Sequence, residues 1–120
     1  MTKIKDMYAG KDFPKVKITV VKKLNWKELF GQELPAAVHE DLIPPECTEF
    51  EVGQEFLIGN SQMIECPPGF CAWAYADIHR EIMHILHGGY YPWMKDEGVI
   101  LTCCTDGFRP VIFKIERIEE

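Results

Sequence analysis

Only one stretch of this 120-residue chain carries a helical period over several turns. Between residues 72 and 87, apolar side chains recur every three or four positions: Tyr75, Ile78, Ile82, Ile85 and Leu86. The opposite face of the expected helix carries polar side chains: Asp77, Arg80, Glu81, His84 and His87. Gly88-Gly89 ends the pattern. Because a doubly wound parallel sheet needs several crossover helices, a single long helix argues against that class.

Alternating apolar and polar residues predict the strands. In 15–22 the apolar side chains fall on one face of the strand: Val16, Ile18 and Val20. Shorter patterns predict strands over about 54–58, 99–105 and 111–118. Asp106-Gly107 lies between the last two, and Asp-Gly is a strong turn signal, so we expect these strands to form an antiparallel hairpin.

These elements together predict an α+β fold. We expect a small single domain over residues 15–120, with an antiparallel or mixed sheet of four to five strands. One long helix, about 72–87, packs on the sheet, and a β-hairpin closes the chain. Residues 1–14 show no sustained period and are expected to be an N-terminal arm. Asn25 is a suitable cap for a short helix over 26–30, and the proline-rich segment 31–46 is expected to be a long surface loop.

Charge and composition narrow the function classes. The chain has 13 basic and 19 acidic residues, a net charge of −6, which disfavours general binding to nucleic acid or to an anionic membrane. No apolar run approaches the length of a membrane helix, and no targeting segment is visible. We therefore expect a cytoplasmic protein with reduced thiols, and its five cysteines could not all pair internally in any case.

Four short motifs follow one another along the chain. They are Cys47-x-x-Phe50-x-x-Gly53-Gln-Glu-Phe56, Pro68-Gly-Phe-Cys71-x-Trp-Ala74-x-x-Asp77-Ile78, Gly88-Gly89-x-x-Pro92-Trp93-Met94 and Cys103-Cys-Thr-Asp-Gly107-x-Arg109-Pro-Val-Ile-Phe113. In this set, over about residues 15–118, the chain resembles a small, functionally uncharacterised prokaryotic domain family. The resemblance implies a fold unit and no catalytic role. It also implies that Cys47, Cys71 and one cysteine of the pair 103–104 are recurrent in the family.

Four cysteines are candidate metal ligands because each lies close to the end of a predicted element: Cys47, Cys71, Cys103 and Cys104. Zinc and iron–sulfur centres both favour thiolate ligands. Adjacent residues of a strand face opposite ways, so only one of the pair 103–104 joins such a site easily. No C-x-x-C spacing supports the hypothesis. Two alternatives stay open: the cysteines are small core residues, or their thiols carry redox or nucleophilic chemistry.

A second hypothesis concerns a small-molecule pocket walled by Trp73 and Trp93, beside Asp106 and Arg109. The guanidinium of Arg109 could fork onto a carboxylate or phosphate. The alternatives are a surface ion pair of Arg109 with Asp106 or Glu116, and a Trp93 that covers the core or packs against a second subunit.

The sequence therefore favours a domain that binds a metal or a small anionic ligand through the face holding the cysteines and Arg109. The first alternative is a structural or protein-interaction module that self-associates as a homo-oligomer, with cysteines in its core. The second is a thiol-dependent redox protein. Glycine-rich phosphate loops, G-x-S-x-G and H-E-x-x-H are all absent, so the sequence does not identify an enzyme class.

Overall fold

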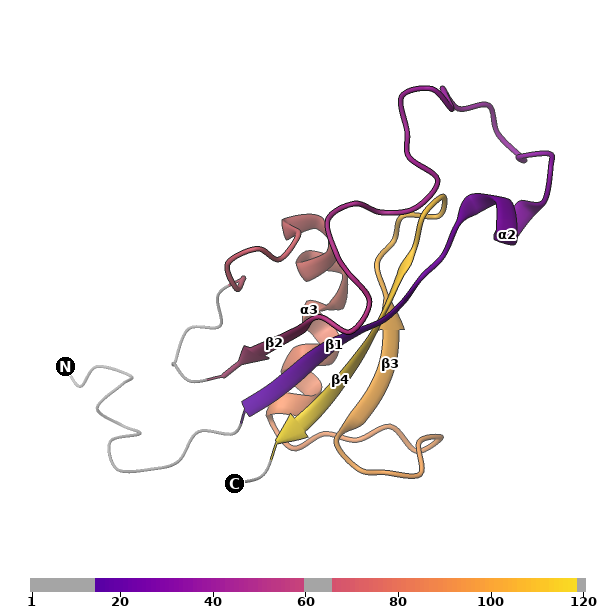
Figure 1. The fold of residues 1–120 in the computed structure, drawn as a ribbon. Helices are drawn as coiled ribbons and strands as arrows, with labels where there is room; N and C mark the ends of the chain where they lie inside the picture. The colour runs from indigo at the N-terminus through magenta and orange to yellow at the C-terminus, as the bar shows by residue number, and fades with distance from the viewer. Residues whose placement is uncertain (1–14, 60–65, 119–120) are drawn as a thin grey trace.

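The computed structural model describes residues 15–59 and 66–118. Its elements, in chain order, are β1 (Lys15–Lys23), α2 (Trp26–Phe30), β2 (Glu55–Ile58), α3 (Ala72–Leu86), β3 (Val99–Cys103) and β4 (Val111–Ile118) (Figure 1). The expected N-terminal arm, residues 1–14, lies outside the described residues.

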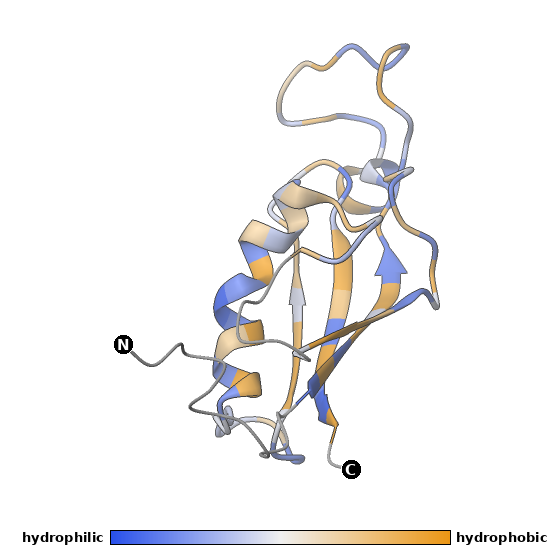
Figure 2. Cartoon of the chain, turned by 90° about the vertical axis from the view of Figure 1, so that its left-hand side faces the viewer, coloured by the Kyte–Doolittle hydropathy of each residue, from blue (hydrophilic) through white to orange (hydrophobic). Residues whose placement is uncertain are grey.

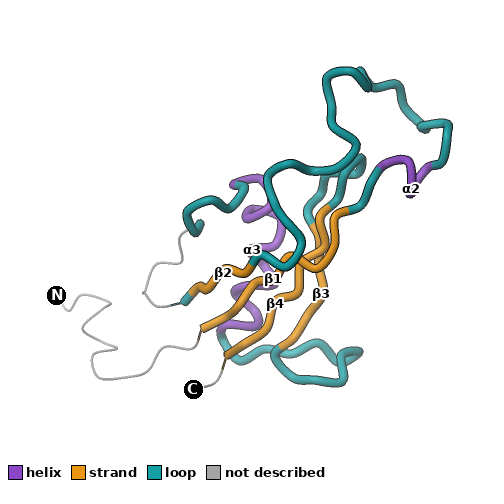
Figure 3. Tube along the Cα trace, viewed as in Figure 1, coloured by secondary structure: helices purple, strands orange, loops and turns teal. Residues whose placement is uncertain are grey.

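The strands form one antiparallel sheet in the order β2-β1-β4-β3, and α3 lies across one face of it (Figure 3). This confirms the α+β prediction and resolves the sheet as antiparallel with four strands in the described residues. The predicted hairpin is β3 with β4, paired from Val99 opposite Glu116 to Cys103 opposite Ile112. The β3–β4 loop and the start of α3 lie at the same end of the sheet (Figure 1).

The inner face of β1 confirms the predicted alternation, since Val16, Ile18 and Val20 are fully buried. Ile18 lies opposite Ile115 on β4, and both side chains face α3 in the core. On the outer face, Lys17 pairs with Glu55 at 3.0 Å and with Glu116 at 3.5 Å. The sheet thus buries one face and exposes a charged one, as its antiparallel pairing allows.

Helix α3 confirms the predicted apolar stripe, because all five of its members are buried. Figure 2 shows the hydrophobic residues of α3 turned toward the sheet. At its C-terminal end, Arg117 of β4 donates from Nη1 to the carbonyl oxygen of Ile85 at 2.9 Å. A cation at this position also suits the negative end of the helix dipole. No helix within the described ranges has the length and apolar character needed to cross a membrane.

The prediction that Glu81 belongs to the polar face of the helix is wrong, because this residue is only 7% exposed. Glu81 lies three residues after Ile78 and four before Ile85, so helical geometry places it at the edge of the apolar stripe. Arg80 donates to Oε1 of Glu81 from Nη2 at 2.8 Å and from Nε at 3.2 Å. The second oxygen, Oε2, is buried without a hydrogen-bond partner in the part of the chain that the structure describes.

An aromatic cluster fills the core between the sheet and the start of α3: Phe50, Phe56, Phe70, Tyr75 and Phe113. Phe113 is fully buried, with its ring centroid 5.2 Å from that of Phe50 and 5.5 Å from that of Phe70. These distances are typical of favourable aromatic pairs. The cluster ties the segment before β2 and the turn before α3 to β4.

The short helix α2 occupies its predicted residues and begins at the predicted cap. The Asn25 side chain accepts a hydrogen bond from the Lys27 amide at 2.8 Å, and Gly31 ends the helix at φ 74°. Trp26 is buried and stacks on Phe108 of the β3–β4 loop, with 5.4 Å between ring centroids. The segment 31–46 that follows is the long loop expected from its prolines.

Candidate functional site

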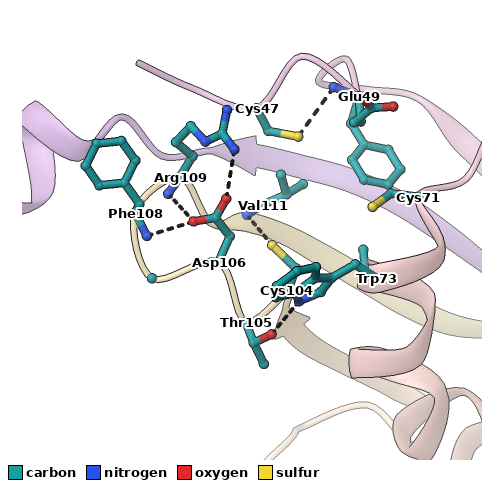
Figure 4. A pocket seen from close by; sticks show the side chains of 13 residues that line it. Cys47, Glu49, Cys71, Trp73, Cys104, Thr105, Asp106, Phe108, Arg109 and Val111 are labelled. Atoms are coloured by element: carbon teal, nitrogen blue, oxygen red, sulfur yellow. Dashed lines mark hydrogen bonds and ion pairs between the residues drawn. The ribbon is translucent and has the colours of Figure 1, made fainter. Parts of the chain in front are cut away.

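A pocket of about 490 Å³ lies where the start of α3 meets the β3–β4 loop and the segment before β2 (Figure 4). Its lining residues come from three parts of the chain, 47–50, 71–74 and 104–111. The volume falls within the roughly 300–1,000 Å³ typical of small-molecule sites. Three segments that are distant in the sequence therefore form one concave site.

The β3–β4 loop owes its shape to the carboxylate of Asp106. Oδ1 of Asp106 accepts hydrogen bonds from the amides of Phe108, at 2.9 Å, and Arg109, at 3.0 Å. This is the local bonding by which aspartate favours turns. The Cys104 amide donates to the carbonyl oxygen of Val111 at 3.1 Å and closes the loop at its base. Asp106 is thus a turn residue as well as part of the pocket wall.

A hydrogen-bond chain fastens this loop to α3. Oδ2 of Asp77 accepts from the Thr105 amide at 2.8 Å and from the Thr105 hydroxyl at 2.9 Å. The Thr105 hydroxyl in turn accepts from Nε1 of Trp73 at 2.8 Å (Figure 4). Trp73 is 68% exposed, yet this bond fixes its indole as a wall of the pocket. Sequence reasoning missed Asp77 and Thr105, because nothing local links residues 28 positions apart.

Arg109 lies in the pocket wall with its side chain 26% exposed. Its Nη2 is 3.4 Å from Oδ2 of Asp106, so the predicted alternative of an ion pair with Asp106 is present. Nε of Arg109 is buried without a hydrogen-bond partner within residues 15–59 and 66–118. A guanidinium offers five donors, and a buried donor left unpaired costs about 1–3 kcal/mol. The side chain thus retains unused capacity to bind an acceptor.

Three of the four predicted cysteines line the pocket: Cys47, Cys71 and Cys104. Cys47 accepts the Glu49 amide at 3.4 Å, and Cys104 accepts the Val111 amide at 3.3 Å, both at Sγ. Cys103 is exposed and is not among the residues that line the pocket, so the structure brings only Cys104 of the adjacent pair to the site.

The donor set does not fit a metal centre in the described residues. No three His, Cys, Asp or Glu side chains within 15–59 and 66–118 are grouped so that they could hold a metal ion. The expected zinc or iron–sulfur site therefore has no support in the geometry.

The structure does not bring Trp93 to the pocket. Trp93 is 72% exposed and lies in the loop that follows α3. Its ring centroid is 5.1 Å from that of Tyr91. The pocket lies at the start of α3, and a helix of 15 residues is about 22 Å long. The two tryptophans, Trp73 and Trp93, thus mark opposite ends of the helix.

The Cys104 thiol predicts a stability change at alkaline pH. Burial raises its pKa above the ordinary value of 9.0, and amide hydrogen bonds from Val111 and Asp106 offset this only in part. Because the folded protein keeps a proton that the unfolded chain releases, this contribution is fully present below pH 9.0 and is lost as the pH rises above it. Urea unfolding between about pH 8 and about pH 10 should therefore show a falling midpoint.

The matched variants are Cys104→Ala and Cys103→Ala. Cys104→Ala should make the urea midpoint fall less steeply with pH. Cys103→Ala removes an exposed thiol whose charge is the smallest cause of the raised Cys104 pKa, so it should change this fall far less. Equal slopes for Cys104→Ala and the wild type would contradict the assignment.

Comparisons with protein-family models, with curated proteins and with solved structures find no match to this chain. The resemblance based on the four motifs thus stays a prediction, and the functional argument rests on the geometry of the pocket.

Proposed function

We propose that this domain binds a small ligand with an apolar body and an anionic group in the pocket between α3 and the β3–β4 loop. The guanidinium of Arg109 engages the anionic group, and the aromatic and sulfur-bearing wall holds the rest of the ligand. One observation about Arg109 carries the proposal. Among the described residues, Arg109 lines the pocket, has one long ion pair and keeps its buried Nε donor without a hydrogen-bond partner.

The pocket wall supports an apolar ligand body. Trp73 and Phe108 present hydrocarbon surface, and the buried side chains of Phe50 and Val111 lie behind them in the wall. The turn and hydrogen bonds described above fix Trp73 and Phe108 in place. A wall that is already ordered loses little entropy when a ligand binds. A flat or aliphatic group fits such a wall better than a highly hydrated one.

The guanidinium of Arg109 supports an anionic group on the ligand. Arg109 is the one cationic residue among those that line the pocket in the described chain, beside the carboxylates of Glu49 and Asp106. Oδ1 of Asp106 accepts hydrogen bonds from two loop amides. Its other oxygen, Oδ2, lies 3.4 Å from Nη2 of Arg109. If the guanidinium turns toward a ligand carboxylate, the two groups form a charge-assisted hydrogen bond. The carboxylate then also serves as the acceptor for the Nε donor of Arg109.

The test is a screen of small carboxylates and phosphates by ligand-observed NMR, repeated on Arg109→Met. The variant keeps much of the aliphatic stem and removes every donor. We expect it to weaken the best hits by about 10- to 100-fold, the loss that corresponds to one or two charge-assisted hydrogen bonds. Lys114→Met, on the outer face of the sheet, makes the same change in net charge and should leave binding intact. Equal affinity of Arg109→Met and the wild type, or no anion bound by either, would overturn the proposal.

A further inference from the structure

We propose that Cys66 and Cys71 form a reversible intramolecular disulfide when the protein meets a disulfide oxidant such as oxidised glutathione. This redox proposal does not depend on the ligand proposed above, although Cys71 also lines the ligand pocket. Cys66 does not line the pocket in the described structure and belongs to none of the motifs singled out in the sequence. The C-x4-C spacing also differs from the C-x-x-C spacing of common redox motifs.

A tight turn lies between the two cysteines and reverses the chain. The Phe70 amide donates to the carbonyl oxygen of Pro67 at 3.1 Å. Pro68 and Gly69 occupy the two central positions, and Gly69 has φ +83°, as a type II turn requires. Such a turn reverses the chain and holds the Cα atoms of its end residues within about 7 Å of each other. Cys66 and Cys71 are the residues that flank this turn on either side.

The Cys66 sulfur lies directly against the start of α3. Its Sγ is 3.5 Å from the carbonyl oxygen of Phe70, and that carbonyl belongs to the peptide bond joining Phe70 to Cys71. Burial raises the pKa of the Cys66 thiol, and the charge of Cys71 raises it further. This electrostatic influence is expected of two neighbouring sulfurs. A disulfide needs Cβ atoms about 3.8 Å apart, so the proposal requires the two side chains to rotate toward each other.

Both thiols are open to reagents. Cys66 is exposed, and Cys71 is partly exposed. Cys71 is the N-cap residue of α3 but makes no capping hydrogen bond with its side chain, so no cap is lost when its sulfur reacts. Of the other three cysteines, Cys104 is buried and Cys103 is on the outer face of the sheet. Cys47 is partly exposed and lies in the segment before β2, where its Sγ accepts the Glu49 amide, so the turn does not join it to Cys71.

The reaction balances as two thiol–disulfide exchanges. One protein thiolate attacks oxidised glutathione, forms a mixed disulfide and releases one glutathione thiolate. The second protein thiolate then attacks the protein sulfur of that mixed disulfide, forms the Cys66–Cys71 bond and releases the second glutathione thiolate. The protein loses two protons and two electrons, and one glutathione disulfide becomes two thiols. Excess reduced glutathione reverses both steps.

The experiment equilibrates the full chain with oxidised glutathione, alkylates the remaining thiols and maps the products by mass spectrometry. We expect Cys66 and Cys71 to be linked to each other and protected from alkylation, while Cys103 reacts. Cys71→Ser and Cys66→Ser should each retain a mixed disulfide with glutathione on the remaining partner, because the thiol that would resolve it has been removed. Cys103→Ser, the matched control, should form the bond as the wild type does.

Two results would overturn the proposal. One is a wild-type protein in which both cysteines stay alkylated to the same extent as Cys103. The other is a stable mixed disulfide on Cys66 or Cys71 of the wild type, which would show that the partner thiol does not reach it.

Discussion

Phe113→Ala should lower the free energy of unfolding by about 3–5 kcal/mol, the usual cost of removing a buried aromatic ring. Phe113 is fully buried on β4 and contacts the rings of Phe50 and Phe70. The substitution thus opens a cavity and removes two aromatic pairs at once. Phe50 also lines the pocket, so a loosened cluster should weaken ligand binding as well. Urea unfolding followed by circular dichroism measures the effect.

Trp93→Ala is the matched control, because it removes a larger ring that is 72% exposed. It should cost at most about 1 kcal/mol and leave ligand binding unchanged. A large loss from Trp93→Ala, or a loss below about 1 kcal/mol from Phe113→Ala, would contradict the described core.

Asp77→Ala should lower the free energy of unfolding by about 1.5–3 kcal/mol, the range for hydrogen bonds to a charged group. The substitution leaves the Thr105 amide and hydroxyl without their shared acceptor, so the hydroxyl that accepts from Trp73 is no longer fixed. We expect the pocket to lose a fixed wall, so anion affinity should fall even though Asp77 does not line the pocket in the described structure. Urea unfolding and the NMR titration described above measure the two effects.

Asp77→Asn and Asp96→Ala separate the effect of the Asp77–Thr105 hydrogen bonds from the effect of losing a negative charge. The asparagine keeps one carbonyl acceptor and should retain part of the stability and of the binding. Asp96 lies in the loop after α3, so Asp96→Ala should behave as the wild type does. If Asp77→Ala and Asp96→Ala have the same stability and the same anion affinity, the Asp77–Thr105 hydrogen bonds do not support the pocket.

The sequence predicts the helices and strands in which buried side chains recur at a regular spacing along the chain. Val16, Ile18 and Val20 alternate in sequence and are all buried in β1, and the stripe that begins at Tyr75 faces the sheet from α3. The Asp106-Gly107 turn lies between the two strands of the hairpin as predicted. In each case the spacing of residues within four positions determines which side chains are buried, so the sequence alone predicts the element.

The site is less predictable because it depends on where elements meet. The predicted residues Trp73, Asp106 and Arg109 do line one pocket, because the β3–β4 loop lies against the start of α3. Trp93 is separated from them by the length of the helix, and Cys103 is turned outward by the alternation of β3. Both exclusions follow from element geometry once the order of the strands is known.

The missed residues owe their roles to tertiary contacts. Asp77 is a polar helix residue by pattern, and its acceptor role exists only because Thr105 reaches it from the loop between β3 and β4. Glu81 sits at the boundary between the polar and apolar faces, and the packing of α3 on the sheet decides that it is buried. Pro68-Gly69 signals a turn between Cys66 and the predicted helix, but only the folded chain shows that the Cys66 sulfur lies against the Phe70 carbonyl oxygen.

The most direct test of the anion pocket is the ¹H–¹⁵N correlation of the Arg109 Nε–H group, assigned by its loss in Arg109→Met. The signal is followed as a small carboxylate or phosphate from the screen is titrated. The proposed function predicts a saturable shift of this signal together with the amides of Trp73, Thr105 and Phe108, while the amides of the loop containing Trp93 stay unchanged. Saturable binding that leaves the Arg109 Nε–H signal in place, or that shifts only amides outside the pocket, would contradict it.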